Sequence, residues 1–228
     1  MKEQLQKDFE NTIRNLSLSQ KDIEIKKFSL DNFINKGFPN RKEEDWKFSD
    51  LNQIINKNIG ELSFYNDYTS TNKVDTSVFV DGLEHNKIVF INGRIEKIDF
   101  DYEKKGQIEI IDQSETINKF DNNNSLSDLN NAFTNKCFKI VIKTGYQLLK
   151  PLIIYHTTNS KIWSKNINLR LDFELQEDSC LRLIDLFNDT SEKNFLNIFY
   201  NFNLKEDAIL KNYKVDKLEN KNIKYSFN

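Results

Sequence analysis

The sequence predicts a mainly β protein, a β-solenoid preceded by a small N-terminal region of α-helices. Two observations lead to this fold class. Apolar residues recur at helical spacing near the N-terminus, whereas nearly every segment after Phe138 alternates in the manner of a strand. A strand–turn–strand unit also repeats, because residues 172–186 align with residues 201–215 at an offset of 29 residues. Strand-rich repeats of about this size are typical of stacked solenoid coils.

Three helices are predicted in the N-terminal region. The apolar residues of the first recur at spacings of four, four and three: Leu5, Phe9, Ile13 and Leu16. A second helix is predicted over 22–36, with Gly37 in the position of a C-terminal cap. Ser49 or Asp50 can cap a short third helix over 51–57.

The pattern then changes to that of strands. Residues 87–100 alternate on both sides of Asn92-Gly93, a strong signal for a type I′ hairpin. A further strand is predicted at 107–112 and a short helix at 126–133. We therefore predict a helical region over 1–73, short strands and a linker over 74–125, and the first part of the solenoid over 126–228.

The repeat carries most of the solenoid prediction. Phe173 aligns with Phe202, and an earlier unit joins at a looser offset of 33 that brings Ile142 onto Leu175. An antiparallel sandwich with similar hairpins is the alternative. The outer coils of a solenoid need a neighbour or a cap. We therefore expect the strand-like end at 225–228 to be covered by another element, or by chain beyond this sequence.

Composition excludes several classes of partner. The 228 residues carry 33 Lys and Arg against 35 Asp and Glu, a formal charge of −2, which offers no broad attraction to nucleic acid or anionic membrane. The first 16 residues lack the apolar core of a secretory signal, and no apolar run approaches the roughly 20 residues that span a bilayer. The two cysteines form no CxxC motif, which favours a reducing cytoplasm.

No side chain stands out as catalytic. His85 follows a polar turn and His156 ends an apolar strand, and a structural role is the better interpretation of both. Cys137 could be a reactive thiol beside the lysines of its strand face, although an ordinary packed or surface cysteine is the stronger interpretation. Cys180 takes a packing position in the repeat. A metal site formed by Cys137, His156 and Cys180 lacks close ligand pairs.

The acidic pairs in the repeat are interpreted as turns. Glu177-Asp178 and Glu206-Asp207 occupy the same position in successive units, which favours structural corners over paired catalytic carboxylates. No P-loop, GxGxxG, GxSxG or HExxH motif occurs. We therefore assign no catalytic, cofactor-binding or metal-ligating residue.

One charged stretch, GFPNRKEEDWKFSDL at 37–51, resembles the N-terminal signature of the SufB/SufD family of iron–sulfur cluster assembly scaffolds, and of its SufD members in particular. The matching positions are Gly37, Phe38, Pro39, Arg41, Lys42, Glu44, Trp46, Lys47, Phe48, Ser49 and Leu51. Three further segments are similar in the same order: VFINGR at 89–94, LNNAF at 129–133 and LLKPLIIYH at 148–156. The resemblance covers the whole chain but only about the first half of a typical family member.

The resemblance implies a right-handed parallel β-helix and a scaffold subunit that is not itself an enzyme. It implies pairing with a SufB-like paralogue and binding to a SufC-like ATPase, with no cofactor held by this chain alone and an iron–sulfur cluster as the product of the assembled complex. Neither nucleic acid nor membrane is expected as a partner. The alternatives are a β-helical carbohydrate-active enzyme and the paralogous scaffold SufB, although the Arg41–Leu51 pattern favours SufD.

The charged stretch itself has two interpretations, a direct partner contact or a structural clamp, and the clamp is preferred. In a clamp, Pro39 starts a turn, while Trp46 and Phe48 anchor the N-terminal helices against the remaining fold. Ion pairs would join Arg41 and Lys42 to Glu44 and Asp45.

Overall fold

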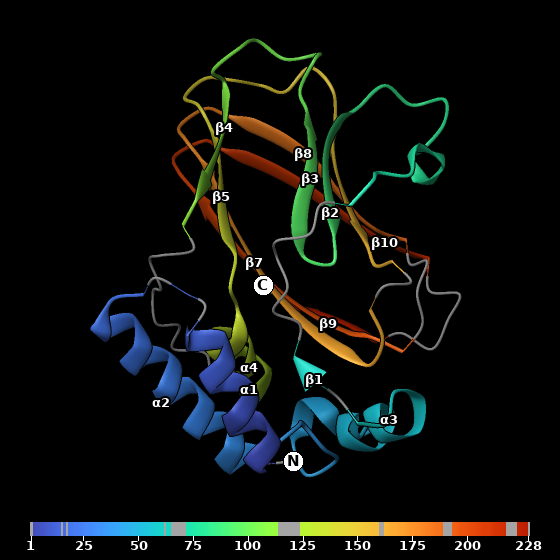
Figure 1. Ribbon diagram of the computed structural model, residues 1–228. Coiled ribbons are helices and arrows are strands. Elements are labelled where there is room, and N and C mark those ends of the chain that lie inside the picture. The colour runs from blue at the N-terminus through green and yellow to red at the C-terminus, as the bar shows by residue number, and fades with distance from the viewer. Residues whose placement is uncertain are drawn as a thin grey trace.

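The computed structural model describes residues 2–14, 16, 18–61, 63–64, 72–113, 124–159, 162–188, 193–217 and 223–227. In this part of the chain, helices gather against one end of two long sheets (Figure 1). The α-helices are α1 (Lys2–Arg14), α2 (Gln20–Lys36), α3 (Leu51–Asn58) and α4 (Ser125–Phe133), and two short 3-10 helices are η1 (Glu44–Trp46) and η2 (Thr76–Val78).

Two sheets form the larger part of the fold. Sheet A runs in the order β11-β9-β7-β5-β4, with β1 also paired to β7; sheet B runs β10-β8-β6-β2-β3. The strands of sheet A are β1 (Ser63–Phe64), β4 (Ile108–Asp112), β5 (Cys137–Ile142), β7 (Lys165–Leu175), β9 (Phe195–Leu204) and β11 (Ile223–Phe227). Those of sheet B are β2 (Asn86–Ile91), β3 (Arg94–Asp99), β6 (Leu152–Thr157), β8 (Cys180–Asn188) and β10 (Ile209–Lys217).

From β5 onward the chain alternates between the two sheets, so that parallel neighbours are two strands apart in the sequence. The repeat offsets are the registers of this pairing. Phe173 lies opposite Phe202 in the β7–β9 pair, and Ile142 lies opposite Leu175 in the β5–β7 pair. Each apolar position therefore lies beside the matching apolar position of the next unit, and these positions form continuous rows across each sheet.

The tight turns repeat as well. Gly145, Asp178 and Asp207 occupy equivalent positions and all have positive φ, at 69°, 56° and 54°. The Gly145 amide donates to the Glu177 carbonyl at 2.8 Å, and the Asp178 amide to the Glu206 carbonyl at 3.1 Å. Glycine and aspartate tolerate this left-handed conformation better than most residues. The acidic pairs are thus stacked turns.

The predicted fold class, a mainly β protein with a right-handed parallel β-helix, is wrong. The described chain is mixed α/β, with four α-helices and two parallel-rich sheets that are not closed. Both sheets end in an antiparallel strand, β3 or β4. The repeat offset determines which strands pair, but an offset does not determine whether the sheets close into coils. The helices also contribute a core of their own, which strand periodicity could not predict.

Most local predictions are confirmed. Gly37 follows the C-terminus of α2 and donates its amide to Phe33 at 2.7 Å, and the Asp50 carboxylate caps α3. The helix α2 begins two residues earlier than predicted, after a cap by Ser19. The Asn92-Gly93 hairpin joins β2 to β3 with φ values of 52° and 79°. A Cβ on Gly93 would also lie 2.8 Å from a methyl carbon of Ile167. The division at residues 73 and 125 stays a prediction, and residues 65–71 and 114–123 lie outside the described ones.

Three apolar clusters hold the fold together. The largest fills the space between the sheets and includes Ile88, Phe90 and Phe173. A second joins the four helices to sheet A through Phe195. A third lies on the outer face of sheet B, under the segment that carries η2. Within the described residues, no helix is both long and apolar enough to cross a bilayer.

A fully buried lysine ties α2 to α4. Lys26 Nζ donates to the carbonyls of Asn131 at 3.0 Å, Ala132 at 3.3 Å and Thr134 at 2.7 Å. These are carbonyls at the C-terminus of α4, where a cation complements the helix dipole. Burial lowers the pKa of Lys26 to about 7, partly opposed by the Asp22 carboxylate. One side chain thereby satisfies the end of a buried helix.

Asparagines dock α4 onto sheet A. Asn130 donates its amide to the carbonyls of Leu169 at 3.2 Å and Asn197 at 2.8 Å. In return, the Asn197 amide donates to the Leu126 carbonyl at 2.9 Å. The LNNAF segment therefore fixes the helix at one position along β7 and β9.

Candidate interaction surface

The charged stretch at 37–51 forms a connection between α2 and α3. The Leu51 amide donates to the Pro39 carbonyl at 3.0 Å, which closes the stretch into a loop around η1. Phe38 and Leu51 are buried at its two ends. Arg41, Lys42, Glu43, Glu44, Asp45 and Lys47 are all exposed. Residues near the two ends of the stretch are thus attached to the fold, and its charges face solvent.

Trp46 and Phe48 have opposite environments. Trp46 packs against the helical core, with its ring 5.8 Å from that of Tyr225 on β11. Phe48 is 88% exposed, so the prediction that it anchors the helices is wrong. No ion pair joins Arg41 or Lys42 to Glu44 or Asp45 in the described loop, so that prediction is wrong as well. The packed residues of the clamp are Phe38, Pro39, Trp46 and Leu51.

The cysteines take different positions in the two sheets. Cys137 is buried on β5, and burial raises the pKa of its thiol to about 12 despite the nearby Arg170 guanidinium. Because the thiolate is the reactive form, burial disfavours a reactive role for this thiol at neutral pH. Cys180 lies opposite Ile209 in the β8–β10 pair, as the repeat alignment predicted. Among the described residues, no group of three or more His, Cys, Asp and Glu side chains could hold a metal ion.

His156 belongs to a buried charged cluster between the sheets. Its Nε2 lies 3.0 Å from the Asp185 carboxylate and 3.0 Å from the Tyr200 hydroxyl. Lys224 from β11 lies 3.3 Å from the same Asp185 and 2.8 Å from Asp216 on β10. Burial alone would raise the pKa of Asp185, but His156 and Lys224 hold it far below its usual range. These residues reach the outermost strands, so the interior is ionic at that end.

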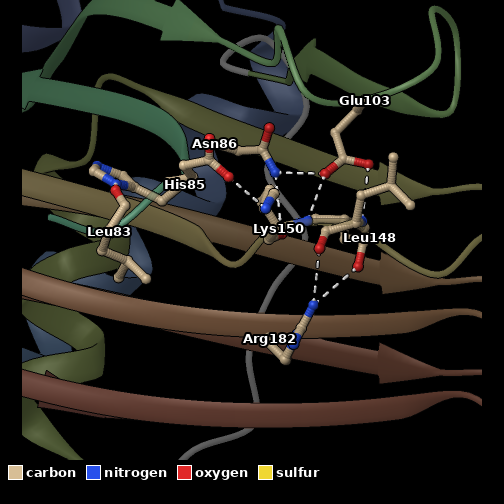
Figure 2. Close-up of polar contacts among 9 residues, drawn as sticks. Leu83, His85, Asn86, Glu103, Leu148, Lys150 and Arg182 are labelled. Atoms are coloured by element: carbon tan, nitrogen blue, oxygen red, sulfur yellow. Dashed lines mark hydrogen bonds and ion pairs between the residues drawn. The ribbon is translucent and has the colours of Figure 1, made fainter.

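A second polar cluster fixes the turn before β6 (Figure 2). The Glu103 carboxylate accepts hydrogen bonds from the Asn86 amide at 2.7 Å, the Tyr146 hydroxyl at 2.7 Å, and the main-chain amides of Leu149 at 3.2 Å and Lys150 at 3.1 Å. Burial raises the pKa of Glu103, but these donors outweigh it and the pKa lies below its usual value. All four bonds hold the local fold, so we interpret Glu103 as structural.

Arg182 supports the same turn from β8. One of its guanidinium nitrogens donates to the carbonyls of Leu148 at 3.3 Å and Leu149 at 3.1 Å (Figure 2). The LLKP segment is therefore held from both sides, by an acid and by a base. Sequence reasoning missed both residues, because each is an ordinary surface charge in the linear pattern.

A cleft of about 520 Å³ lies between α1, α3 and β1. Among the described residues that line it, Glu61 is the ionisable one, which gives no acid–base pair for catalysis. Its other lining residues are Gln4, Leu5, Phe38, Asn52, Ile55, Asn56, Gly60, Ser63 and Phe64.

The outermost strand of sheet B is the most distinctive surface. β10 pairs with β8 along one side, and no strand pairs with its other side in the described part of the chain. Ile209, Tyr213 and Val215 lie on its outward face with exposed fractions of 53%, 58% and 45%, and exposed Lys211 lies between the first two. Unpaired main-chain groups beside exposed apolar side chains are a template for strand pairing with another chain. We call these three residues and this strand edge the β10 surface.

The β10 surface could have been found in the sequence. The repeat aligns Tyr213 with Ile184 and Val215 with Leu186, so the outward positions are apolar in both units. Leu186 is covered by Val74, Phe79 and Val80, whereas Val215 is exposed.

Comparison with models of known protein families gives no match, and a search of curated proteins gives none either. The resemblance of residues 37–51 to the scaffold family therefore contributes to the functional argument as a proposal.

Proposed function

We propose that the protein is a scaffold subunit of an iron–sulfur cluster assembly machinery of the SUF type. It acts by binding other proteins, a SufB-like paralogue and a SufC-like ATPase, and performs no catalysis itself. The β10 surface is the observation that carries the proposal, because it combines three exposed apolar side chains with a strand edge that pairs with no other strand in the described part of the chain. The identity of the partners comes from the resemblance at 37–51.

Two further observations support this proposal. The polar clusters around Glu103 and Asp185 use their charged groups to hold strands and turns, which suits a rigid platform. Cys137 and Cys180 form no disulfide, which agrees with a reducing compartment such as the cytoplasm. The alternative of a carbohydrate-active enzyme depended on a β-helical groove, and the open sheets remove that basis.

The test is co-purification of the tagged chain with a SufB-like protein and a SufC-like ATPase. We expect a complex with the natural sequence and at least about tenfold weaker binding when Tyr213→Lys and Val215→Lys are combined, since central apolar contacts dominate such interfaces. Ile111→Lys is the matched control. Ile111 is 42% exposed and lies on β4, the outermost strand of the other sheet at the end far from β10.

Each outcome has a separate meaning. Binding that survives both lysines would show that another surface makes the contact. The absence of any complex with the natural sequence, while circular dichroism shows a folded chain, would contradict the proposed function itself.

A further inference from the structure

Residues 72–85, which we call the strap, cover an apolar area on the outer face of sheet B. Figure 1 shows this segment, with η2, running beside β2. Val74, Phe79 and Val80 of the strap pack on a cluster of buried side chains from three neighbouring strands: Val89, Ile91, Ile153, Tyr155 and Leu186. The strap is therefore the cover of a small core of its own.

Few polar contacts attach the middle of the strap to the sheet. Within residues 73–84 as described, the Val80 amide is the main-chain group that reaches the sheet, donating to the Tyr155 hydroxyl at 3.0 Å. At one end, Asn72 donates to Glu96 at 3.2 and 2.9 Å. Near the other end, Glu84 pairs with Lys150 at 2.6 Å. A segment held by so few main-chain bonds can open without disturbing the sheets.

His85 completes a chain of hydrogen bonds at the end of the strap. Its Nδ1 lies 2.6 Å from the Leu83 carbonyl and its Nε2 lies 2.7 Å from the Tyr155 hydroxyl. A carbonyl can only accept, so Nδ1 carries the hydrogen and Nε2 is the acceptor. The Val80 amide therefore donates to Tyr155, and Tyr155 donates to His85. This sequence of donors requires a neutral imidazole.

Protonation of His85 breaks that sequence. A hydrogen on Nε2 would point at the Tyr155 oxygen, and the Tyr155 hydrogen would lose its acceptor. The charged groups that face the ring from the other strands are Lys87 on β2 and Asp99 on β3. Burial is the largest effect and lowers the pKa of His85. The hydrogen bond to the Leu83 carbonyl opposes it, Lys87 lowers the pKa further, and Asp99 has the smallest effect, which raises it. The closed strap therefore disfavours the protonated ring.

We propose that the strap is a pH-sensitive cover, closed over sheet B when His85 is neutral and released when His85 is protonated. Opening uncovers the apolar cluster on β2, β6 and β8. This area adjoins the β10 surface, since Ile184 and Leu186 on β8 lie opposite Tyr213 and Val215 on β10. The strap responds to pH in the isolated chain, so the inference does not depend on the proposed function.

The sign follows from linkage. The open strap has an ordinary histidine pKa of about 6.5 and the closed strap a lower one. The free energy that favours closing is therefore fully present above about pH 6.5, and it falls as the pH drops below that value.

Hydrogen exchange of the full chain at pH 7.5 and 5.5 tests the proposal, with rates corrected for the intrinsic pH dependence of exchange. We expect protection of the Val80 amide to fall at the lower pH, by up to about tenfold, the limit set by one full unit below an open-state pKa of 6.5. His85→Asn keeps a donor for Leu83 but cannot be protonated in this range, so its protection should not change with pH.

Two further variants distinguish the effect of the His85–Tyr155 hydrogen bond from the effect of packing in the strap. Tyr155→Phe keeps the ring that packs 5.0 Å from Phe79 but removes the hydroxyl, so the strap should exchange quickly at both pH values. Asp81→Asn is the matched control, an exposed acid of the strap that should leave the pH response unchanged. Equal protection of the natural chain at both pH values, or a pH response retained in His85→Asn or Tyr155→Phe, would overturn the proposal.

Discussion

The two ends of the paired sheets are built differently. At one end, which we call the closed end, the outermost strands β3 and β4 run antiparallel to their neighbours. Four of the six residues of β3 are charged: Arg94, Glu96, Lys97 and Asp99. At the open end, the outermost strands β10 and β11 are parallel to their neighbours, and β10 carries exposed Ile209, Tyr213 and Val215. Charges on an edge strand discourage pairing with another chain. β10 also carries charges, at four of its nine positions, so the closed end resists such contacts more than the open end does.

In the interior the contrast is reversed, because the buried charged groups lie next to the open end. The space next to the closed end is filled by Ile88, Phe90 and Phe138, whereas the space next to the open end contains Asp185 and Lys224. Charged groups are costly to bury, and their pairing offsets that cost only when its geometry is good. The open end therefore combines exposed apolar side chains on β10 with a buried ionic cluster beside the apolar core.

The largest effect is expected in the interior of the open end. Asp185→Asn removes the carboxylate shared by His156 and Lys224 and leaves a buried ammonium with one acid fewer. We expect a loss of about 3 kcal/mol in the free energy of unfolding at pH 7, typical of breaking a buried pair. Urea denaturation measures it. Ile88→Val at the closed end is the control, with an expected loss of about 1 kcal/mol.

The same variant has a pH signature. The folded-state pKa of Asp185 is depressed, so its contribution is present above about pH 4 and is lost as the pH falls below that value. Asp185→Asn should therefore flatten the acid limb of the stability curve. An unchanged acid limb would mean that the cluster contributes little to the open end.

A smaller effect is expected at the closed end. Glu103→Gln places an amide hydrogen where the carboxylate accepted bonds from the turn at 149–150. We expect a loss of about 2 kcal/mol, together with faster hydrogen exchange at Leu149 and Lys150. Glu84→Gln is matched to it, because Glu84 also contacts Lys150 but is exposed, and its loss should stay below about 0.5 kcal/mol. Equal losses in the two variants would contradict the structural role of Glu103.

The sequence predicted the strands of the open end and their pairing register better than it predicted the fold class or the buried ion pairs. The offset between Phe173 and Phe202 is a local property of the repeat, and it equals the pairing register. The fold class was wrong, because whether sheets close depends on contacts between distant segments. Asp185 lies in the apolar run CLRLIDLF, which could have marked it as buried, but its partner Lys224 comes from a strand far along the chain. Long-range ion pairs of this kind leave no periodic signal.

The smallest effect concerns how the helices hold the open end. Trp46 packs on Tyr225 of β11, while Phe48, two residues later, is exposed. Trp46→Ala should lower the free energy of unfolding by about 1–2 kcal/mol, less than for a fully buried Trp, whereas Phe48→Ala should change it by less than about 0.5 kcal/mol. Thermal unfolding of both variants measures the difference.

The pair also decides between the two interpretations of the charged stretch. If the stretch is a clamp, Trp46→Ala should speed hydrogen exchange in β11 and weaken partner binding only as far as it loosens that strand. A large loss of binding in Phe48→Ala at unchanged stability would instead make the loop around η1 a direct contact, since Phe48 has no packing role to lose. The open end would then have two adjacent binding regions, one on β10 and one on the loop beside β11.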